Sequence, residues 1–126
     1  MEEIKINSLP TMECGMAYLA HPYASAFPDI NAFNLIDAGN IAFKIIMKYL
    51  NLTIISPLHN YSFFEGKELK ETEILKYDFR LLSRCDILIL SGKWRLSCGC
   101  MSEYGYAKAK GIRIYEYVDG TLYPLE

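Results

Sequence analysis

The sequence lacks several features that would each point to a particular class of protein. It has no apolar run long enough to span a membrane, and its acidic start, Met1-Glu2-Glu3, is unlike the basic start of a signal peptide. Its formal net charge is only −2, and its 13 Lys and Arg residues are scattered along the chain. We therefore expect a cytoplasmic protein that binds neither a membrane nor a nucleic-acid polymer.

Residues that commonly bind metals are also few, with four cysteines and two histidines in the whole chain. The cysteines, Cys14, Cys85, Cys98 and Cys100, form no paired CxxC motif, so a four-ligand zinc site would need an unusual combination of loops. We expect reduced thiols, with Cys85 in the core. Cys98 and Cys100 are interpreted as small filler in preference to reactive thiolates at a helix start. Neither a metal nor a cofactor is predicted.

What the sequence does contain is the pattern of one α/β domain. At 126 residues it is long enough for one core, and no composition shift marks a second. Residues 1–16, with a candidate strand at 4–6, are predicted to be an extension of the domain formed by residues 17–126. Short apolar runs predict strands at 17–20, 53–55, 87–90 and 112–115, and helical spacing predicts helices at 34–50, 73–84 and 100–110. This alternation indicates a single Rossmann-like or flavodoxin-like domain, whose parallel sheet of four or five strands is flanked by helices.

The first predicted helix has apolar residues at helical spacing. Its stripe includes Ile36, Phe43, Ile46 and Leu50, with Gly39 on the same face. We expect this face to pack closely on the sheet.

Three of the predicted strands end in polar or proline-containing loops. The first is followed by His21, Pro22 and Tyr23, the second by a turn that contains His59, and the third by the loop 91–95. Single loops of this kind are ordinary, because turns favour such residues. In a parallel sheet, however, ligands bind beyond the carboxyl ends of the strands near a topological switch point. We therefore expect the three loops to meet around one pocket.

Asp78 lies in the apolar stripe of the helix predicted at 73–84. At 100° per residue it falls between Ile74 and Leu81, so its carboxylate should point toward the sheet. Burying an unpartnered charge is costly, which leaves a hydrogen-bonded group, a protonated group with a raised pKa, or one open to a cleft. A cleft-facing acid and a structural aspartate are both open. For Asp86, which precedes the third strand, we expect a structural hydrogen bond.

A candidate anion site follows the third predicted strand. Glu103 is expected in the first turn of a helix, where the backbone N–H groups and the helix dipole would keep it ionised. Ser97 fits either an N-cap or a hydroxyl that binds a ligand, and Lys93 and Arg95 indicate an anion-facing loop. Trp94 fits a stacking surface as well as a core anchor.

Four short motifs together carry a resemblance to a known family. They are Tyr18-Leu19-Ala20-His21-Pro22-Tyr23, Ser56-Pro57-Leu58-His59, the pair Asp78 and Asp86, and Lys93-Trp94-Arg95-Leu96-Ser97-Cys98-Gly99 leading to Glu103-Tyr104-Gly105-Tyr106-Ala107. Over about residues 17–117 these motifs resemble the nucleoside 2-deoxyribosyltransferase-like superfamily, in particular its small phage and bacterial members. Ser97, Gly99 and Glu103 also resemble the 5-hydroxymethyl-deoxyuridine monophosphate N-hydrolase branch.

The resemblance implies an enzyme that cleaves the N-glycosidic bond of a nucleoside 5′-monophosphate, by hydrolysis or base exchange. Glu103 would be the nucleophile, Asp78 would help the base to leave, and Ser97 would hold the 5′-phosphate. The other residues expected to bind substrate are Tyr18, His21, Pro22, Tyr23, His59, Lys93, Trp94, Arg95 and Gly99.

Two other functions stay open at the level of sequence, namely a protein that binds nucleotides without cleaving them and a structural protein with a degenerate pocket. The family habit of sharing active sites between subunits implies a homodimer. Its interface would include some of the C-terminal aromatic residues, Tyr104, Tyr106, Tyr115, Tyr117 and Tyr123.

Overall fold

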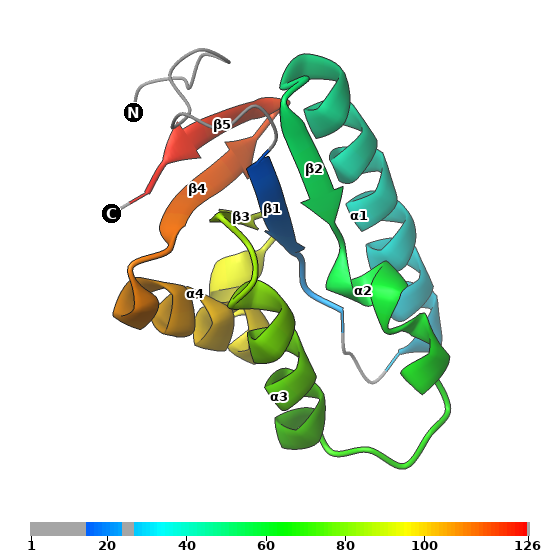
Figure 1. Cartoon of the computed structure of the whole chain (residues 1–126). Coiled ribbons are helices and arrows are strands. Elements are labelled where there is room, and N and C mark those ends of the chain that lie inside the picture. Colours follow the sequence, from blue (N-terminus) through cyan, green and yellow to red (C-terminus); the bar gives the residue numbers. More distant parts are fainter. Residues whose placement is uncertain (1–14, 24–26, 126) are drawn as a thin grey trace.

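Figure 1 shows the computed structural model of the chain, which describes residues 15–23 and 27–125. Its centre is a five-stranded sheet in the order β2-β1-β3-β4-β5. The strands are β1 (Gly15–Ala20), β2 (Leu52–Ile55), β3 (Ile87–Leu90), β4 (Arg113–Val118) and β5 (Thr121–Pro124). The first four strands are parallel, and β5 pairs antiparallel with β4. The predicted α/β class, with a parallel sheet flanked by helices, is confirmed, except that the last strand is antiparallel.

Helices cover both faces of this sheet. They are α1 (Pro28–Lys48), α2 (Pro57–Asn60), α3 (Glu71–Leu82) and α4 (Cys98–Lys110), with short 3-10 helices η2 (Ser62–Phe64) and η3 (Trp94–Leu96). In Figure 1, α1 runs along one side of the sheet and α3 and α4 lie on the other. Among the described residues, no helix combines the length and the apolar character needed to cross a membrane.

The two faces of the sheet bury two separate apolar clusters, because side chains alternate along each strand. Leu19 of β1 packs with Ile41 and Ile45 of α1. Its neighbour Tyr18 points to the opposite face and packs in the cluster that contains Leu82 of α3. β3 is buried at every position, as expected for a central parallel strand covered on both sides.

Helix α1 exists as predicted, but the face assigned to the core is wrong. The helix buries Ala38, Ile41 and Ile45, whereas Ile36 is 66% and Phe43 is 61% exposed. Apolar residues occur on two opposite sides of this helix, so their spacing alone could not identify the side that packs. The helix also begins at Pro28 and not near residue 34, with proline in the first turn, where its missing N–H costs nothing.

No strand was predicted at residues 121–124, where the structure has β5. β4 extends to Val118, and Asp119 and Gly120 then take positive φ values of 47° and 88°. An Asp-Gly pair with this geometry is typical of the tight turn of a β-hairpin, which carries the chain into β5. At the other end of the domain, β1 begins at Gly15, two residues before the predicted strand. The candidate strand at 4–6 lies outside the described residues.

Candidate active site

A cleft of about 1210 Å³ opens at the carboxyl ends of β1 and β3. β2 lies on one side of β1 and β3 on the other, so this edge is the topological switch point of the sheet, where ligands of such folds bind. Eight of the predicted site residues line the cleft: His21, Pro22, Tyr23, Asp78, Lys93, Ser97, Gly99 and Glu103.

Glu103 is the most buried acid of the cleft, with 5% of its surface exposed. The hydroxyl of Tyr18, a fully buried residue of β1, donates a hydrogen bond to Glu103 Oε2. Although Tyr18 is not among the residues that line the cleft, it holds the carboxyl group that does. Burial raises the pKa of Tyr18 well above its usual value, with a further contribution from Glu103, so this hydroxyl keeps its proton.

The expectation that the helix dipole keeps Glu103 ionised is wrong. α4 begins at Cys98, which places Glu103 in the second turn of the helix, and the dipole effect falls off within the first. Burial instead raises the pKa of Glu103 to about 8, opposed by the Tyr18 hydrogen bond and reinforced by the charge of Asp78. Burial of Glu103 therefore favours its protonated form.

Asp78 faces the same cleft from α3, as the helical periodicity indicated. Burial raises its pKa to about 6. The two carboxyl groups consequently titrate about two pH units apart, with Asp78 the first to lose its proton. A pair of acids with separated pKa values is the arrangement that acid–base catalysis needs.

Ser97 is the N-cap of α4, because its Oγ accepts a hydrogen bond of 3.2 Å from the backbone N–H of Cys100. It also lines the cleft, next to Gly99 and the exposed Lys93. The start of a 13-residue helix therefore borders the cavity, with a cationic side chain nearby. A negatively charged ligand group is favoured at such a place.

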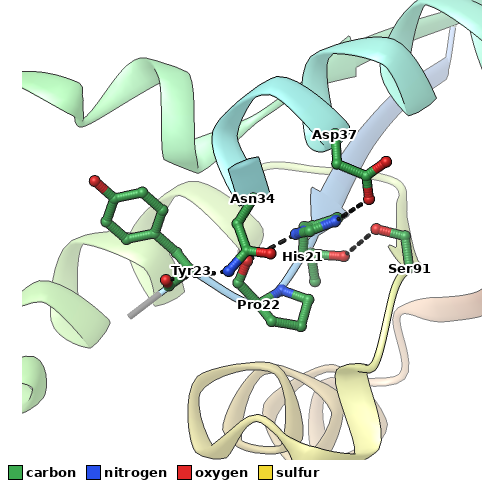
Figure 2. Close-up of polar contacts among 7 residues, drawn as sticks. His21, Pro22, Tyr23, Asn34, Asp37 and Ser91 are labelled. Carbon is green, nitrogen blue, oxygen red and sulfur yellow. Dashed lines mark hydrogen bonds and ion pairs between the residues drawn. The ribbon is translucent and has the colours of Figure 1, made fainter. Parts of the chain in front are cut away.

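His21 contributes to the cleft by holding its wall (Figure 2). Its Nδ1 lies 2.7 Å from the carbonyl oxygen of Pro22, and its Nε2 lies 2.8 Å from Oδ2 of Asp37 in α1. Both partners accept hydrogen bonds, so both contacts form when the ring carries two protons. The polar group that this wall presents to a ligand is Asp37, whose side chain is 39% exposed. Sequence reasoning missed Asp37; the signal was an acid one turn before the buried Ile41.

The loop after β3 packs tightly against this wall. Ser91 donates a hydrogen bond of 2.8 Å from its hydroxyl to the carbonyl of Ala20, which joins the exits of β3 and β1 (Figure 2). Gly92 follows with a φ of +65°, and a Cβ there would lie 3.1 Å from His21 Nε2 and 3.3 Å from Pro22 Cδ. Only glycine fits this backbone conformation and this close approach without strain.

The outer part of the cleft is aromatic. Tyr61 and Phe64 stack with parallel rings 5.2 Å apart, and Phe33 of α1 lines the same cavity. The hydroxyl of Tyr23 donates a hydrogen bond to Glu65, which raises the pKa of Tyr23 to about 12. This region gives a planar ligand an apolar surface for stacking.

Three predicted substrate-binding residues lie elsewhere. Trp94 is buried in the core and donates a hydrogen bond of 2.9 Å to Glu116, and Arg95 lies over the Trp94 ring and pairs with the same carboxylate at 2.7 Å. His59 is engaged with Ser56, with 2.7 Å between Nδ1 and Oγ. None of the three is among the residues that line the cleft.

Other expectations have mixed outcomes. Asp86 is structural, as expected, and accepts a hydrogen bond of 2.8 Å from the Met16 N–H. Cys85 and Cys100 are buried, whereas Cys98 is exposed and lines the cleft, so it is not filler. Within residues 15–23 and 27–125, no group of three or more His, Cys, Asp or Glu side chains is arranged to hold a metal ion.

The fold and the cleft define an α/β protein with two acids of raised pKa at the switch point of its sheet. Among solved structures, the chain is similar to a 2-desoxiribosyltransferase from Leishmania mexicana, with a TM-score of 0.50 and 19% sequence identity. The likeness covers 88% of this chain and 79% of that one. It confirms the nucleoside 2-deoxyribosyltransferase-like fold predicted from the motifs. No protein-family model and no curated protein matches the sequence.

Proposed function

We propose that this protein cleaves the N-glycosidic bond of a 2′-deoxynucleoside 5′-monophosphate, by hydrolysis or by transfer to another base. The observation that carries the proposal is that Glu103 and Asp78 face one cleft at the switch point of the sheet. The fold, shared with a 2-desoxiribosyltransferase, supports the same reaction class.

In the proposed reaction, the ionised carboxylate of Glu103 attacks C1′ of the sugar as the bond from C1′ to the base nitrogen breaks. Asp78 donates its proton to the departing base, whose electron pair would otherwise leave as an anion. The resulting glycosyl ester of Glu103 is then cleaved by water, or by a second base, which gives up a proton to the Asp78 carboxylate. Tyr18 positions Glu103 through its hydrogen bond.

The remaining residues of the cleft would bind the two ends of the substrate. The 5′-phosphate would lie at the start of α4, near Ser97, Gly99 and Lys93, where backbone N–H groups and a cation meet the cavity. The base would stack in the aromatic region beside Tyr61 and Phe64.

The test is to incubate the protein with each deoxynucleoside 5′-monophosphate and the matching nucleoside, and to follow free base by chromatography. We expect release of at least one base, with the nucleotide preferred over the nucleoside. Glu103→Gln should abolish release, whereas Glu68→Gln, which changes an exposed acid that is not among the residues lining the cleft, should retain it. Absence of release from every substrate, or equal rates in wild type and Glu103→Gln, would refute the proposal.

A second function is favoured by the burial of Glu103, which raises its pKa to about 8 and so favours the neutral acid. A neutral acid is a poor nucleophile but a good hydrogen-bond donor, which suits a protein that captures nucleotides without cleaving them. Calorimetry and chromatography on the same sample separate the two functions. Tight binding with the nucleotide recovered intact at every pH favours capture.

A further inference from the structure

One wall of the cleft carries side chains that the proposed reaction does not use. Phe33, Asn34 and Asp37 of α1 line the cavity together with Tyr23 from the loop after β1, and we call these four residues the α1 wall. In Figure 1, α1 lies on the other side of the sheet from α3, which carries Asp78. A part of the substrate that turns away from Asp78 would therefore meet the α1 wall.

The hydrogen-bond donors of the α1 wall are directed largely at protein oxygens. The amide of Asn34 donates a hydrogen bond of 3.3 Å to the carbonyl of Tyr23, and the hydroxyl of Tyr23 donates to Glu65. Both ring nitrogens of His21 lie within 2.8 Å of protein oxygens, one of which is Oδ2 of Asp37 (Figure 2). These contacts hold the wall in place and leave few N–H or O–H groups for a ligand.

Asp37 keeps one oxygen available as an acceptor. Its Oδ2 contacts His21, no residue within 15–23 and 27–125 donates to its Oδ1, and its side chain is 39% exposed. A carboxylate accepts hydrogen bonds and donates none. Because the side chain of His21 is only 3% exposed, it holds the carboxylate at a fixed position, which lowers the entropy lost when a ligand binds. The wall therefore presents a preorganised acceptor to the cavity.

We propose that Asp37 selects bases that carry an exocyclic amino group, such as cytosine and adenine, over bases that have an oxygen there, such as uracil and hypoxanthine. The inference rests on the proposed function, since it takes the ligand to be a deoxynucleoside 5′-monophosphate. The amino group would donate to Oδ1 of Asp37, and the ring of Phe33 would contact the base beside it. A base with oxygen at that position would set one acceptor against another, with no proton between them.

The other polar groups on this side of the cleft favour the same choice. Glu65, which accepts the hydrogen bond from Tyr23, adds a second carboxylate beside the α1 wall. Ser62 and Lys67, which can donate, also line the cleft, but both are exposed residues. Lys93 borders the start of α4, where the phosphate is placed. Acceptors therefore predominate where the base would lie, which suits a base edge with N–H groups.

Two other roles for Asp37 predict a different result. Asp37 would act only as a structural partner of His21, or it would accept a hydrogen bond from the 3′-hydroxyl of the sugar. Every deoxynucleotide has the same sugar and meets the same wall, so either role affects all bases alike. Only recognition of the amino group makes the affinity depend on the base. A hydrogen bond to a charged group corresponds to a preference of about 10- to 100-fold.

The test uses two pairs of nucleotides that differ by the exchange of the amino group for an oxygen. They are the 5′-monophosphates of deoxycytidine and deoxyuridine, and those of deoxyadenosine and deoxyinosine. Dissociation constants are measured by calorimetry in Glu103→Gln, which is expected to leave the ligands intact, and release of base is followed in the wild type. We expect the amino member of each pair to bind about 10- to 100-fold more tightly.

The variant Asp37→Asn, made in the same Glu103→Gln background, reverses the hydrogen-bonding character of the wall. Its amide oxygen can still accept from His21, and its NH₂ group then points to the ligand. The preference for the amino member should fall by at least about 10-fold, with tighter binding of the deoxyuridine nucleotide. Glu68→Gln, at an exposed acid that is not among the residues lining the cleft, should keep the preference.

The outcomes separate this inference from the proposed cleavage. Equal affinities within both pairs, or an equal loss of affinity for all four nucleotides in Asp37→Asn, would overturn the role of Asp37 and leave the cleavage reaction standing. A preference for amino bases that Asp37→Asn removes, while the wild type leaves every nucleotide intact, would support the role of Asp37 and count against cleavage. Binding of none of the four nucleotides would overturn the inference, whatever the release assay shows.

Discussion

The variant Asp78→Asn shows which limb of the pH–rate profile belongs to each of the two carboxyl groups of the cleft. In the wild type, the proposed reaction needs Glu103 ionised and Asp78 protonated, although their pKa values of about 8 and about 6 favour the opposite distribution. In the reactive form the proton is on Asp78, the stronger of the two acids, and Glu103 is ionised. With a separation of about two pH units, this form is about 100-fold less populated than its counterpart.

The pH dependence of kcat/KM follows from these values. For the wild type we expect a bell with limbs near pH 6 and pH 8, because the productive form is lost below the first and above the second. In Asp78→Asn only the ionisation of Glu103 remains, so activity should rise with pH through a single limb and show no alkaline decline. That limb should lie somewhat below pH 8, since the negative charge of Asp78 no longer raises the pKa of Glu103.

Asp78→Asn should also lower the rate of base release. Without its acid, the variant should lose about 10²–10⁴ in kcat/KM at the optimum, and most of all for substrates whose bases leave poorly. The assay is initial-rate release of base from pH 5 to pH 10, with Glu68→Gln, at an exposed residue that does not line the cleft, as a control that keeps the bell-shaped profile. If Asp78→Asn instead keeps the decline near pH 8 and loses the limb near pH 6, Asp78 is the base and Glu103 the acid, and the proposed roles are reversed.

Three further outcomes can be measured. Burial raises the pKa of Glu103 from 4.5 to about 8, so the folded protein holds a proton that the unfolded chain releases, and the free energy of unfolding falls as pH rises between these values. In urea unfolding between pH 5 and pH 8, Glu103→Gln should make this decrease smaller by up to about 4 kcal/mol. Gly92→Ala should lower the melting temperature more than Gly66→Ala. In both variants alanine must adopt a positive φ, which costs about 1–2 kcal/mol, but only the Cβ added at Gly92 would also press against His21. Tyr18→Phe removes a hydrogen bond that lowers the pKa of Glu103, so a ¹³C NMR titration should place that pKa above about 8; an unchanged value would refute the contact.

Local pattern was sufficient for much of the fold and for part of the site. The strands at 17–20 and 87–90 were predictable from short apolar runs, because central parallel strands are buried on both faces. The edge strand at 53–55 was predictable from its β-branched run Thr53-Ile54-Ile55. The direction in which Asp78 points followed from 100° of rotation per residue. The predicted meeting of the loops after the first three strands around one pocket followed from the parallel topology, and Pro57 and Leu58 bring the second of these loops to the cleft.

Properties that depend on distant partners were out of reach of the sequence. The pKa of Glu103 is set by its burial and by Tyr18, 85 residues earlier in the chain. The pairing of His21 with Asp37 depends on how α1 docks, which apolar residues on two sides of that helix left undetermined. Sequence leaves Trp94 open between a stacking surface and a core anchor, because the choice depends on its contact with Glu116, 22 residues later in the chain.

Trp94 is the only tryptophan of the chain, and its position makes it an intrinsic fluorescence probe. The indole is shielded from water and lies under the guanidinium of Arg95, in a 3-10 turn whose two neighbours, Lys93 and Ser97, border the cavity. A ligand bound in the part of the cavity near Lys93 and Ser97 is expected to disturb this turn and so to change the fluorescence of Trp94. Affinities can then be obtained by titration of the unlabelled protein, without waiting for any bond to break.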